Sequence, residues 1–259
     1  MSRMEASFSN RRSARWRAML FRHLPWTFWG WATRLRSGSA SSVAAFRRQC
    51  VGARSYVDPS VQVAGWRNVQ IGADTAISEE CWLNVNFRDT ETKRIVVGDF
   101  CHIGRRNFFS SGPQIVLKDF CFTGIDCQFL GAGHDIRSPL VPYIASGLSN
   151  GAPIEIGVNC WLTTAVTVLE GVTIGHGSVI GARSVVQTNI PPFSVAVGNP
   201  CRVVKRFDFQ NDRWIAASAW TPELERLVPD ERAYRTTLAQ REQGIEPSLF
   251  SASRRFGWI

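Results

Sequence analysis

The sequence predicts an all-β fold, a three-sided coil built from six-residue repeats. Small or branched apolar residues recur at every sixth position, and three repeats of six close one turn of such a coil. A small side chain follows many of these apolar residues four positions later, which gives a second register with the same period. The repeats fall into six triplets: Val51, Val57, Val63; Ile71, Ile77, Leu83; Val97, Ile103, Phe109; Leu117, Thr123, Phe129; Ile156, Leu162, Val168; and Ile174, Ile180, Val186.

The intervals between successive triplets locate the loops of the coil. The last interval, from Ile156 to Ile174, is as long as one turn of the coil and leaves no residues for a loop. The interval from Leu117 to Ile156 is longer than two turns. A shorter excess separates Leu83 from Val97, and the two other intervals are only slightly longer than a turn. Glycine follows several of the apolar residues, where we expect tight corners. The long insertion after Phe129 is unusual in a compact coil, and long loops on rigid scaffolds often carry function.

The cysteines indicate reduced thiols inside the coil. Five of the seven fall in the small-residue register, and none has the spacing of a metal site or a CxxC motif. We therefore expect buried gap-filling side chains and a cytoplasmic protein. No apolar run reaches the length of about 18–20 residues that crosses a bilayer, and arginines interrupt every stretch that would serve as a signal peptide.

The excess positive charge lies in an N-terminal arm, residues 1–50. The arm has ten Arg and one Glu, a net charge of +9, whereas residues 51–259 hold 20 basic and 20 acidic residues. Between residues 11 and 36, arginines alternate with Trp and other apolar residues. This pattern is typical of a segment on an anionic membrane surface, here the inner face of the plasma membrane, through residues 1–36. The alternative is an arm that packs its tryptophans on the coil or on a neighbouring subunit. No nucleic-acid motif is present.

The C-terminal end predicts short helices. Thr221 followed by Pro222 forms a helix start, and the sequence from Pro229 to Glu231 opens a second helical pattern, which Gly244 would end. The predicted organisation is therefore the arm, the coil over residues 51–207 with an inserted loop at 131–155, and a helical extension over 208–259.

The repeat pattern, [LIV]-G-x-x-[small]-x, resembles that of the hexapeptide-repeat acyltransferases. It is most regular from Ile156 to Val186, and Gly198-Asn199-Pro200-Cys201-Arg202-Val203-Val204 resembles the closing motif of that family. The similar segment covers more than half of the chain. The resemblance implies a left-handed parallel β-helix of about six coils, acetyl-CoA as co-substrate, and a homotrimer with active sites between neighbouring subunits.

His134 is the candidate catalytic residue because it lies in the long insertion. In similar sugar and xenobiotic acetyltransferases, a His at the start of such a loop is the general base, and Gly133-His134-Asp135 matches that placement. An imidazole with a pKa near 6.5 suits the removal of a hydroxyl proton at neutral pH. Asp135, Glu155 or a backbone carbonyl would orient the ring. His102 and His176 lie on regular coils, where we expect structural roles.

The resemblance also implies binding residues. Asn84 corresponds to an Asn that contacts the sugar, although a structural Asn at a coil corner is the alternative. Trp161 lies in a repeat that matches the family's W-[IL]-G sequence, with Thr163 in place of Gly. Backbone amides near Thr164 and Ala182 would bind the pantetheine arm of CoA. The cations for the CoA phosphates would be Arg183, Arg202 and Lys205, each of which is otherwise an ordinary solvated charge.

The sequence thus predicts an O-acetyltransferase that transfers acetyl directly to a carbohydrate hydroxyl. The acceptor would be a cell-envelope polysaccharide, its precursor or an oligosaccharide. The alternatives are an amino-sugar N-acyltransferase, an antibiotic or other xenobiotic O-acetyltransferase, and a membrane-associated scaffold without activity. A zinc enzyme on the same fold needs three His ligands that meet, and the histidines here occupy unlike registers, so no metal is expected.

Overall fold

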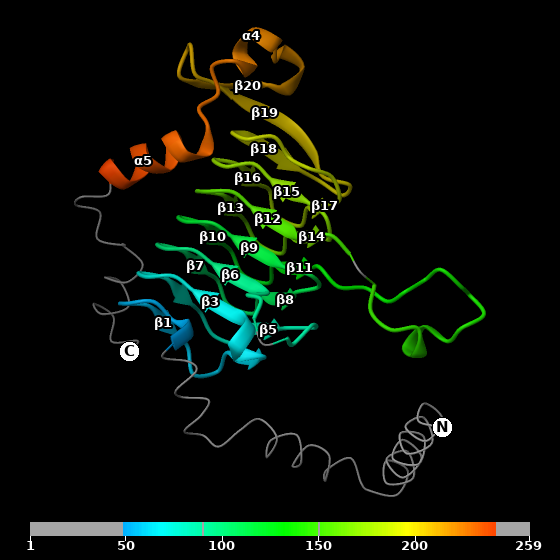
Figure 1. Cartoon of the computed structure of the whole chain (residues 1–259). Coiled ribbons are helices and arrows are strands. Elements are labelled where there is room, and N and C mark those ends of the chain that lie inside the picture. The colour runs from blue at the N-terminus through cyan, green and yellow to red at the C-terminus, as the bar shows by residue number, and fades with distance from the viewer. Residues whose placement is uncertain (1–48, 90, 150, 242–259) are drawn as a thin grey trace, which may run out of the picture. The chain divides into compact units, whose positions relative to one another are not determined.

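The computed structural model describes residues 49–89, 91–149 and 151–241, and these form a left-handed parallel β-helix (Figure 1). Each coil contributes one short strand to each of three sheets, so the fold predicted from the repeats is confirmed. The basic arm up to residue 48 and the helix end expected at Gly244 lie outside the described residues. Within these residues, no helix is long and apolar enough to cross a membrane.

The strands are two to seven residues long and pair in three sheets. The nine-stranded sheet contains, in order, β1 (Tyr56–Val57), β4 (Ala76–Ile77), β7 (His102–Ile103), β10 (Phe122–Thr123), β13 (Trp161–Leu162), β16 (Val179–Ile180), β18 (Ser194–Val197), β19 (Arg202–Asp208) and β20 (Arg213–Ala216). The six-stranded sheet contains β2 (Gln62–Ala64), β5 (Trp82–Asn84), β8 (Phe108–Ser110), β11 (Gln128–Leu130), β14 (Thr167–Leu169) and β17 (Val185–Val186). The five-stranded sheet contains β3 (Val69–Ile71), β6 (Ile95–Val97), β9 (Ile115–Leu117), β12 (Ile154–Ile156) and β15 (Thr173–Ile174).

The core is the interior of the coil, and the six-residue repeat supplies it. Leu83, Phe109, Phe129 and Val168 lie opposite one another on successive strands and are fully buried. The rings of Phe109 and Phe129 stack with their centroids 4.5 Å apart. Consecutive side chains of a strand point to opposite faces, so a strand of the five-stranded sheet turns two alternate residues inward, as β9 does with Ile115 and Leu117.

The corner between the five- and nine-stranded sheets turns through a residue in the left-handed region. Asp74, Phe100, Phe120 and Asn159 adopt φ values of 53° to 62° there, and each donates its N–H to a carbonyl of the coil before. This hydrogen bond offsets the cost of about 1–2 kcal/mol that a left-handed L-residue carries. The glycine of the repeat therefore has another purpose: a Cβ on Gly72 would lie 2.4 Å from Asp99 Oδ1 of the next coil.

All seven cysteines are buried free thiols, as expected from the register of five of them. The Cys81 thiol donates to the Gly104 carbonyl at 3.1 Å and the Cys121 thiol to the Gly157 carbonyl at 3.2 Å, in each case one coil further on. Burial raises the pKa of Cys160 to about 12. These thiols are packing groups rather than reactive nucleophiles.

Antiparallel strands and short helices follow the last coil. β18 pairs antiparallel with β19, and β19 pairs antiparallel with β20, a hairpin that the sequence pattern did not predict. The buried Arg206 on β19 binds Glu225 at 2.6 Å and lies over the Trp220 ring at 4.0 Å. The helices α4 (Pro222–Glu225) and α5 (Glu231–Arg241) begin where the sequence predicted them, and Thr221 caps α4.

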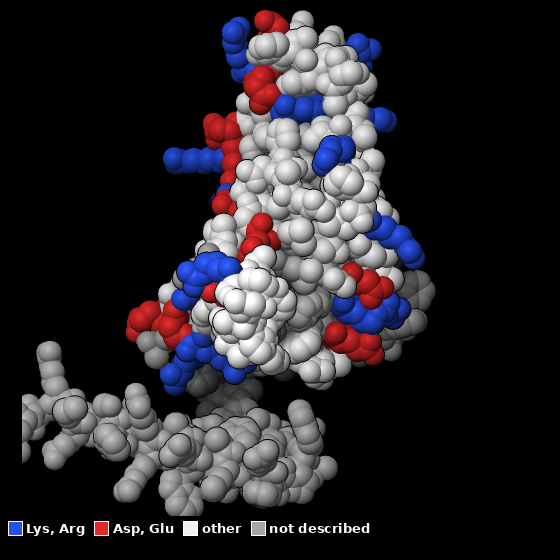
Figure 2. Space-filling model, turned by 90° about the vertical axis from the view of Figure 1, so that its right-hand side faces the viewer, with Lys and Arg blue, Asp and Glu red and all other residues white. Residues whose placement is uncertain are grey.

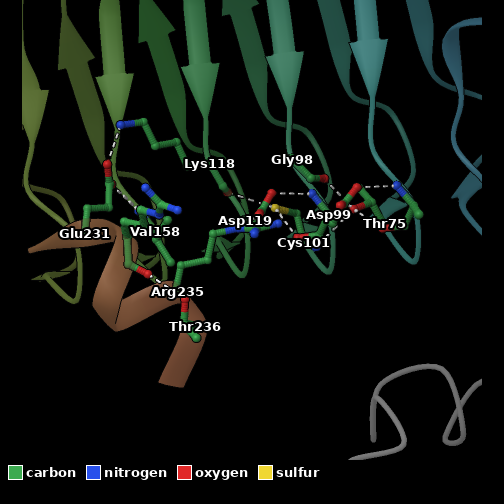
Figure 3. Close-up of polar contacts among 12 residues, drawn as sticks. Thr75, Gly98, Asp99, Cys101, Lys118, Asp119, Val158, Glu231, Arg235 and Thr236 are labelled. Atoms are coloured by element: carbon green, nitrogen blue, oxygen red, sulfur yellow. Dashed lines mark hydrogen bonds and ion pairs between the residues drawn. The ribbon is translucent and has the colours of Figure 1, made fainter. Parts of the chain in front are cut away.

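Helix α5 lies against the corner of the coil at the level of β9 and β12 (Figure 3). In earlier coils a corner carboxylate accepts the amide of the coil before: Asp99 accepts from Ala73 N at 2.7 Å, and Asp119 accepts from Asp99 N at 2.9 Å. The Val158 amide is instead bound by Glu231 of α5, at 2.9 Å. Helix α5 thus supplies a carboxylate that the corner itself lacks at this level.

Further polar contacts attach α5 to the coil. Lys118 Nζ lies 2.5 Å from Glu231, and Arg235 pairs with Asp119 (Figure 3). Lys118 Nζ also lies 2.5 Å from Glu155. His176 is 8% exposed, and its Nε2 lies 2.9 Å from the carbonyl of Pro229, just before the helix. His176 therefore has the structural role expected of it.

The attachment of α5 should weaken in acid. Burial alone would raise the pKa of Glu231, but its hydrogen bonds with Lys118 and the Val158 amide outweigh burial and lower that pKa. A lowered folded-state pKa means that the stabilisation is present above the unfolded value of about 4.3 and is lost as pH falls through the folded value. Hydrogen exchange of α5, corrected for intrinsic rates, should accelerate below about pH 4 while the core strands stay protected. Glu231→Gln should accelerate it already at pH 7; unchanged protection in both cases would contradict this account.

Candidate active site

His134 lies at the base of the long loop, which connects β11 to β12 over residues 131–153 and projects from the coil (Figure 1). The base of this loop is a short antiparallel pair. Ser149 N donates to the Gly133 carbonyl at 2.9 Å, Asp135 N donates to the Gly147 carbonyl at 3.1 Å, and His134 lies opposite Leu148. The backbone of His134 is therefore held, while its side chain is exposed.

A polar corner of the preceding coils fixes the start of this loop. Asn86 Oδ1 accepts from Ser110 Oγ and from Gly112 N, both at 3.2 Å, and Gly131 N donates to the Ser110 carbonyl at 2.8 Å. Gly112 has a φ of 52°, and a Cβ there would lie 1.6 Å from the Gly131 carbonyl oxygen. Sequence reasoning missed these residues; the available signal was the polar Ser-Ser-Gly that interrupts the apolar pattern after Phe109.

The two carboxylates considered as partners of the imidazole are engaged elsewhere. Asp135 forms an ion pair with Arg137 at 2.6 Å, and this hydrogen-bonded guanidinium lowers the pKa of Asp135 to about 2. Glu155 pairs with Lys118 on the outer side of the five-stranded sheet. Within the described residues, neither carboxylate hydrogen-bonds to His134.

Asn84 lies at the same edge of the six-stranded sheet as the loop that carries His134. It is the last residue of β5, opposite Ser110 of β8, which in turn lies opposite Leu130 of β11. Two strand spacings of about 4.8 Å place Asn84 roughly 10 Å from Leu130. The structure therefore brings the predicted base and the predicted acceptor contact to one edge.

The residues expected to bind CoA gather at the opposite edge of the six-stranded sheet. Thr164 and Ala182 are exposed at the same corner of successive coils, and Arg183 N donates to the Thr164 carbonyl at 2.9 Å. Trp161 precedes this corner on β13, is 46% exposed, and stacks on Phe122 with centroids 6.1 Å apart. Thr163, in place of the family's Gly, donates its hydroxyl to the Ile180 carbonyl at 2.8 Å.

Arg202 and Lys205 lie on β19, beyond the last coil, and both are exposed. In the part of the chain that the structure describes, neither they nor Arg183 take part in an ion pair. The three cations are thus available to an anionic ligand. Arg183 and His134 lie at opposite edges of the six-stranded sheet. In a single chain these edges are separated by the length of a three-residue strand, about 10 Å.

The three described histidines do not meet. His102 points outward from β7, His134 lies in the loop, and His176 is buried at a corner. Burial lowers the pKa of His102. Across residues 49–89, 91–149 and 151–241, no group of three His, Cys, Asp or Glu side chains is placed to hold a metal ion.

Comparison with known proteins finds acetyltransferases. A putative acetyltransferase of Staphylococcus aureus (strain COL) is 43% identical over 114 residues, which are 44% of this chain and 56% of that protein. The galactoside O-acetyltransferase of Escherichia coli (strain K12) is 37% identical over 123 residues, 45% of this chain and 57% of that protein. The chain thus spans little more than half the length of these curated relatives. No family model matches the chain.

One solved structure resembles the chain over most of its length. AntD, an N-acyltransferase from Bacillus cereus crystallised with dTDP and 3-hydroxybutyryl-CoA, matches with a TM-score of 0.53 over 78% of this chain and 97% of that chain. The identity of 16% limits this likeness to the fold.

Proposed function

We propose that this chain, which belongs to the hexapeptide-repeat acyltransferase family, transfers an acetyl group from acetyl-CoA to a hydroxyl of a carbohydrate. The observation that carries the proposal is the exposed His134, held at the base of a long loop, at the same sheet edge as Asn84. The similarity to a galactoside O-acetyltransferase supports the sugar as acceptor. We infer a cell-envelope polysaccharide, its precursor or an oligosaccharide as the physiological acceptor.

The transfer is direct. The imidazole of His134 accepts the hydroxyl proton as the hydroxyl oxygen attacks the thioester carbonyl; the C–S bond then breaks, and the CoA thiolate takes the proton from the imidazolium. The burial of all seven cysteines supports a mechanism without a thiol nucleophile. Asp135 binds both the guanidinium and the backbone amide of Arg137. We therefore infer that a backbone carbonyl orients the imidazole.

Acetyl-CoA binds along the other edge of the six-stranded sheet. The exposed corner with Thr164 and Ala182 offers backbone amides to the pantetheine arm, and Trp161 offers an apolar surface beside it. Arg183, Arg202 and Lys205, which form no ion pair among the described residues, bind the phosphates.

The second candidate is acyl transfer to the amine of an amino sugar, the alternative that the sequence also leaves open; AntD shows that a protein of this fold can be an N-acyltransferase. The two functions differ in the acceptor atom. A screen of sugar hydroxyl and amino-sugar acceptors with acetyl-CoA, which measures released thiol and then locates the acetyl group by NMR, distinguishes an ester product from an amide.

His134→Ala should lower kcat by about 10²- to 10⁴-fold, the usual contribution of general acid–base catalysis, with acetyl-CoA binding close to that of the unmodified protein. Steady-state kinetics on an identified acceptor measure the effect. His102→Ala is the matched control and should change kcat far less, because its ring packs beside Phe122 on β10. Near-normal turnover of His134→Ala would refute the base assignment.

We expect a homotrimer, because an active site between two copies joins the His134 edge of one to the CoA corner of its neighbour. Light scattering on the purified full-length chain should give three times the mass of one chain at micromolar concentration. A single-chain mass would rule out a shared site.

The basic arm, outside the described residues, should attach a cytoplasmic enzyme to the inner face of the plasma membrane. Deleting residues 1–36 removes eight Arg and one Glu, a change of 7 out of the total charge of +9. Each cation near an anionic leaflet contributes about 1 kcal/mol, so the full-length chain should sediment with anionic vesicles in a salt-sensitive way, and the truncated chain should not. Acetyl transfer to a soluble acceptor should survive the deletion. If the full-length chain ignores the vesicles, or the truncated chain fails to fold, the arm is a packing element instead.

A further inference from the structure

The outer face of the six-stranded sheet carries two columns of side chains beside the loop with His134. Because alternate residues of a strand share a face, β5 presents Trp82 and Asn84 outward, and β8 presents Phe108 and Ser110. The strand pairing puts Trp82 opposite Phe108 and Asn84 opposite Ser110. The next strand, β11, continues into Gly131 and the loop.

Aromatic rings form the column further from the loop. Trp82 is 47% exposed, and its ring lies 5.0 Å from the ring of Phe108, centroid to centroid, at an interplanar angle of 41°. Gln128 follows Phe108 in this column. The column nearer the loop begins with the half-buried amide of Asn84. Ser110 follows it, but Ser110 is only 8% exposed and its hydroxyl already donates to Asn86.

This face has no charged residue in either column on these three strands. Figure 2 shows the side of the molecule from which the loop projects, where uncharged atoms cover most of the surface and charged side chains gather mainly toward its margins. At the far edge of the sheet, Arg106 is paired with Asp126 at 2.8 Å. An anionic polymer would find no free cation in these columns. The exposed ring of Trp82 and the half-buried ring of Phe108 beside the Asn84 amide suit a neutral sugar, which has an apolar ring face and a rim of hydroxyls.

The distances separate stacking from reaction. Across the sheet, Trp82 lies two strand spacings, about 10 Å, from β11. Along β5, Trp82 lies two residues before Asn84, and so about 7 Å further from the edge where the loop emerges. A single sugar ring cannot both stack on Trp82 and reach His134. The stacking ring and the reacting ring are therefore different units of one chain.

We propose that this face binds the acceptor and that the acceptor is an uncharged oligosaccharide or polysaccharide, with one ring on Trp82 and Phe108, Asn84 hydrogen-bonded beside it, and a neighbouring ring at His134. This rests on the proposed acetyl transfer to carbohydrate and adds its class, polymeric and neutral. Trp82 and Phe108 become specificity residues that act on acceptor binding rather than on the chemical step.

Kinetics on the full-length chain with three acceptor probes test the proposal. The probes are neutral tetrasaccharides of glucose and of galactose, the tetrasaccharide of galacturonate, and the methyl glycosides of the single neutral sugars. Trp82→Ala and Phe108→Ala should each raise the KM for the accepted neutral tetrasaccharide about tenfold, which corresponds to about 1.4 kcal/mol, with kcat and the KM for acetyl-CoA nearly unchanged. The methyl glycosides should react with a KM that neither substitution alters.

Phe100→Ala is the matched control. Phe100 is also an exposed aromatic residue, 37% accessible, and its ring stacks on that of Phe120 with the centroids 5.3 Å apart. It lies at the corner between the five- and nine-stranded sheets, away from the six-stranded sheet. It should leave every KM unchanged. The proposal is overturned if Trp82→Ala and Phe108→Ala leave the tetrasaccharide KM unchanged, or if galacturonate is the better acceptor.

Saturation-transfer NMR without acetyl-CoA separates this inference from the proposed function. Saturation should reach the ring protons of a neutral tetrasaccharide, and this transfer should be lost in Trp82→Ala and kept in Phe100→Ala. That result supports sugar binding on this face even if no sugar is acetylated; in that case only the proposed acetyl transfer is refuted. If saturation reaches neither neutral tetrasaccharide, the proposed binding of an acceptor on this face is refuted, whether or not the enzyme acetylates some other sugar.

Discussion

The hydrogen bonds between successive coils are the constraint on which the structure depends. Each strand is short, so the coil closes only if every residue lies over its counterpart one turn earlier, as Leu83, Phe109 and Phe129 do. Two of the three corners keep a constant length through the regular coils, because an added residue there would shift the register of every following strand. The insertions therefore leave at the third corner, after the six-stranded sheet, where chain length is free. The loop that carries His134 emerges from this corner.

This constraint also explains how the candidate site is divided. The chain returns to each edge of the six-stranded sheet once per coil, so side chains that are distant in sequence line up in columns. The edge with the loops holds Asn84 and the exposed His134, and the opposite edge holds the exposed backbone corner and Arg183. The rigid sheet between them sets the distance that an extended co-substrate must cover, and preorganisation of this kind is what a direct transfer between two substrates requires.

The repeats made the coil predictable because every strand needs an inward apolar residue at a fixed position, and this requirement is visible in the local sequence. The place of His134 in a loop outside the coil was also predictable, because that loop interrupts the repeat; its role as base stays a prediction. The corner of Asn86, Ser110 and Gly112 was not, because its residues become partners only after two coils stack. The same holds for α5, where Glu231 binds an amide 73 residues earlier in the chain. The glycines of the repeat were predictable as positions but not in their purpose, which is close approach to the next coil.

The antiparallel hairpin after the last coil has a consequence for solubility. The last coil of a β-helix ends in strands whose outer backbone N–H and C=O groups are unpaired, and the strands of a second molecule could pair with them. Here β19 reverses direction against β18, and the buried Arg206, paired with Glu225, holds it there. Exposed Arg202 and Lys205 further charge that strand. With β20 paired antiparallel beyond β19, the nine-stranded sheet no longer ends in a parallel strand onto which a second coil could stack.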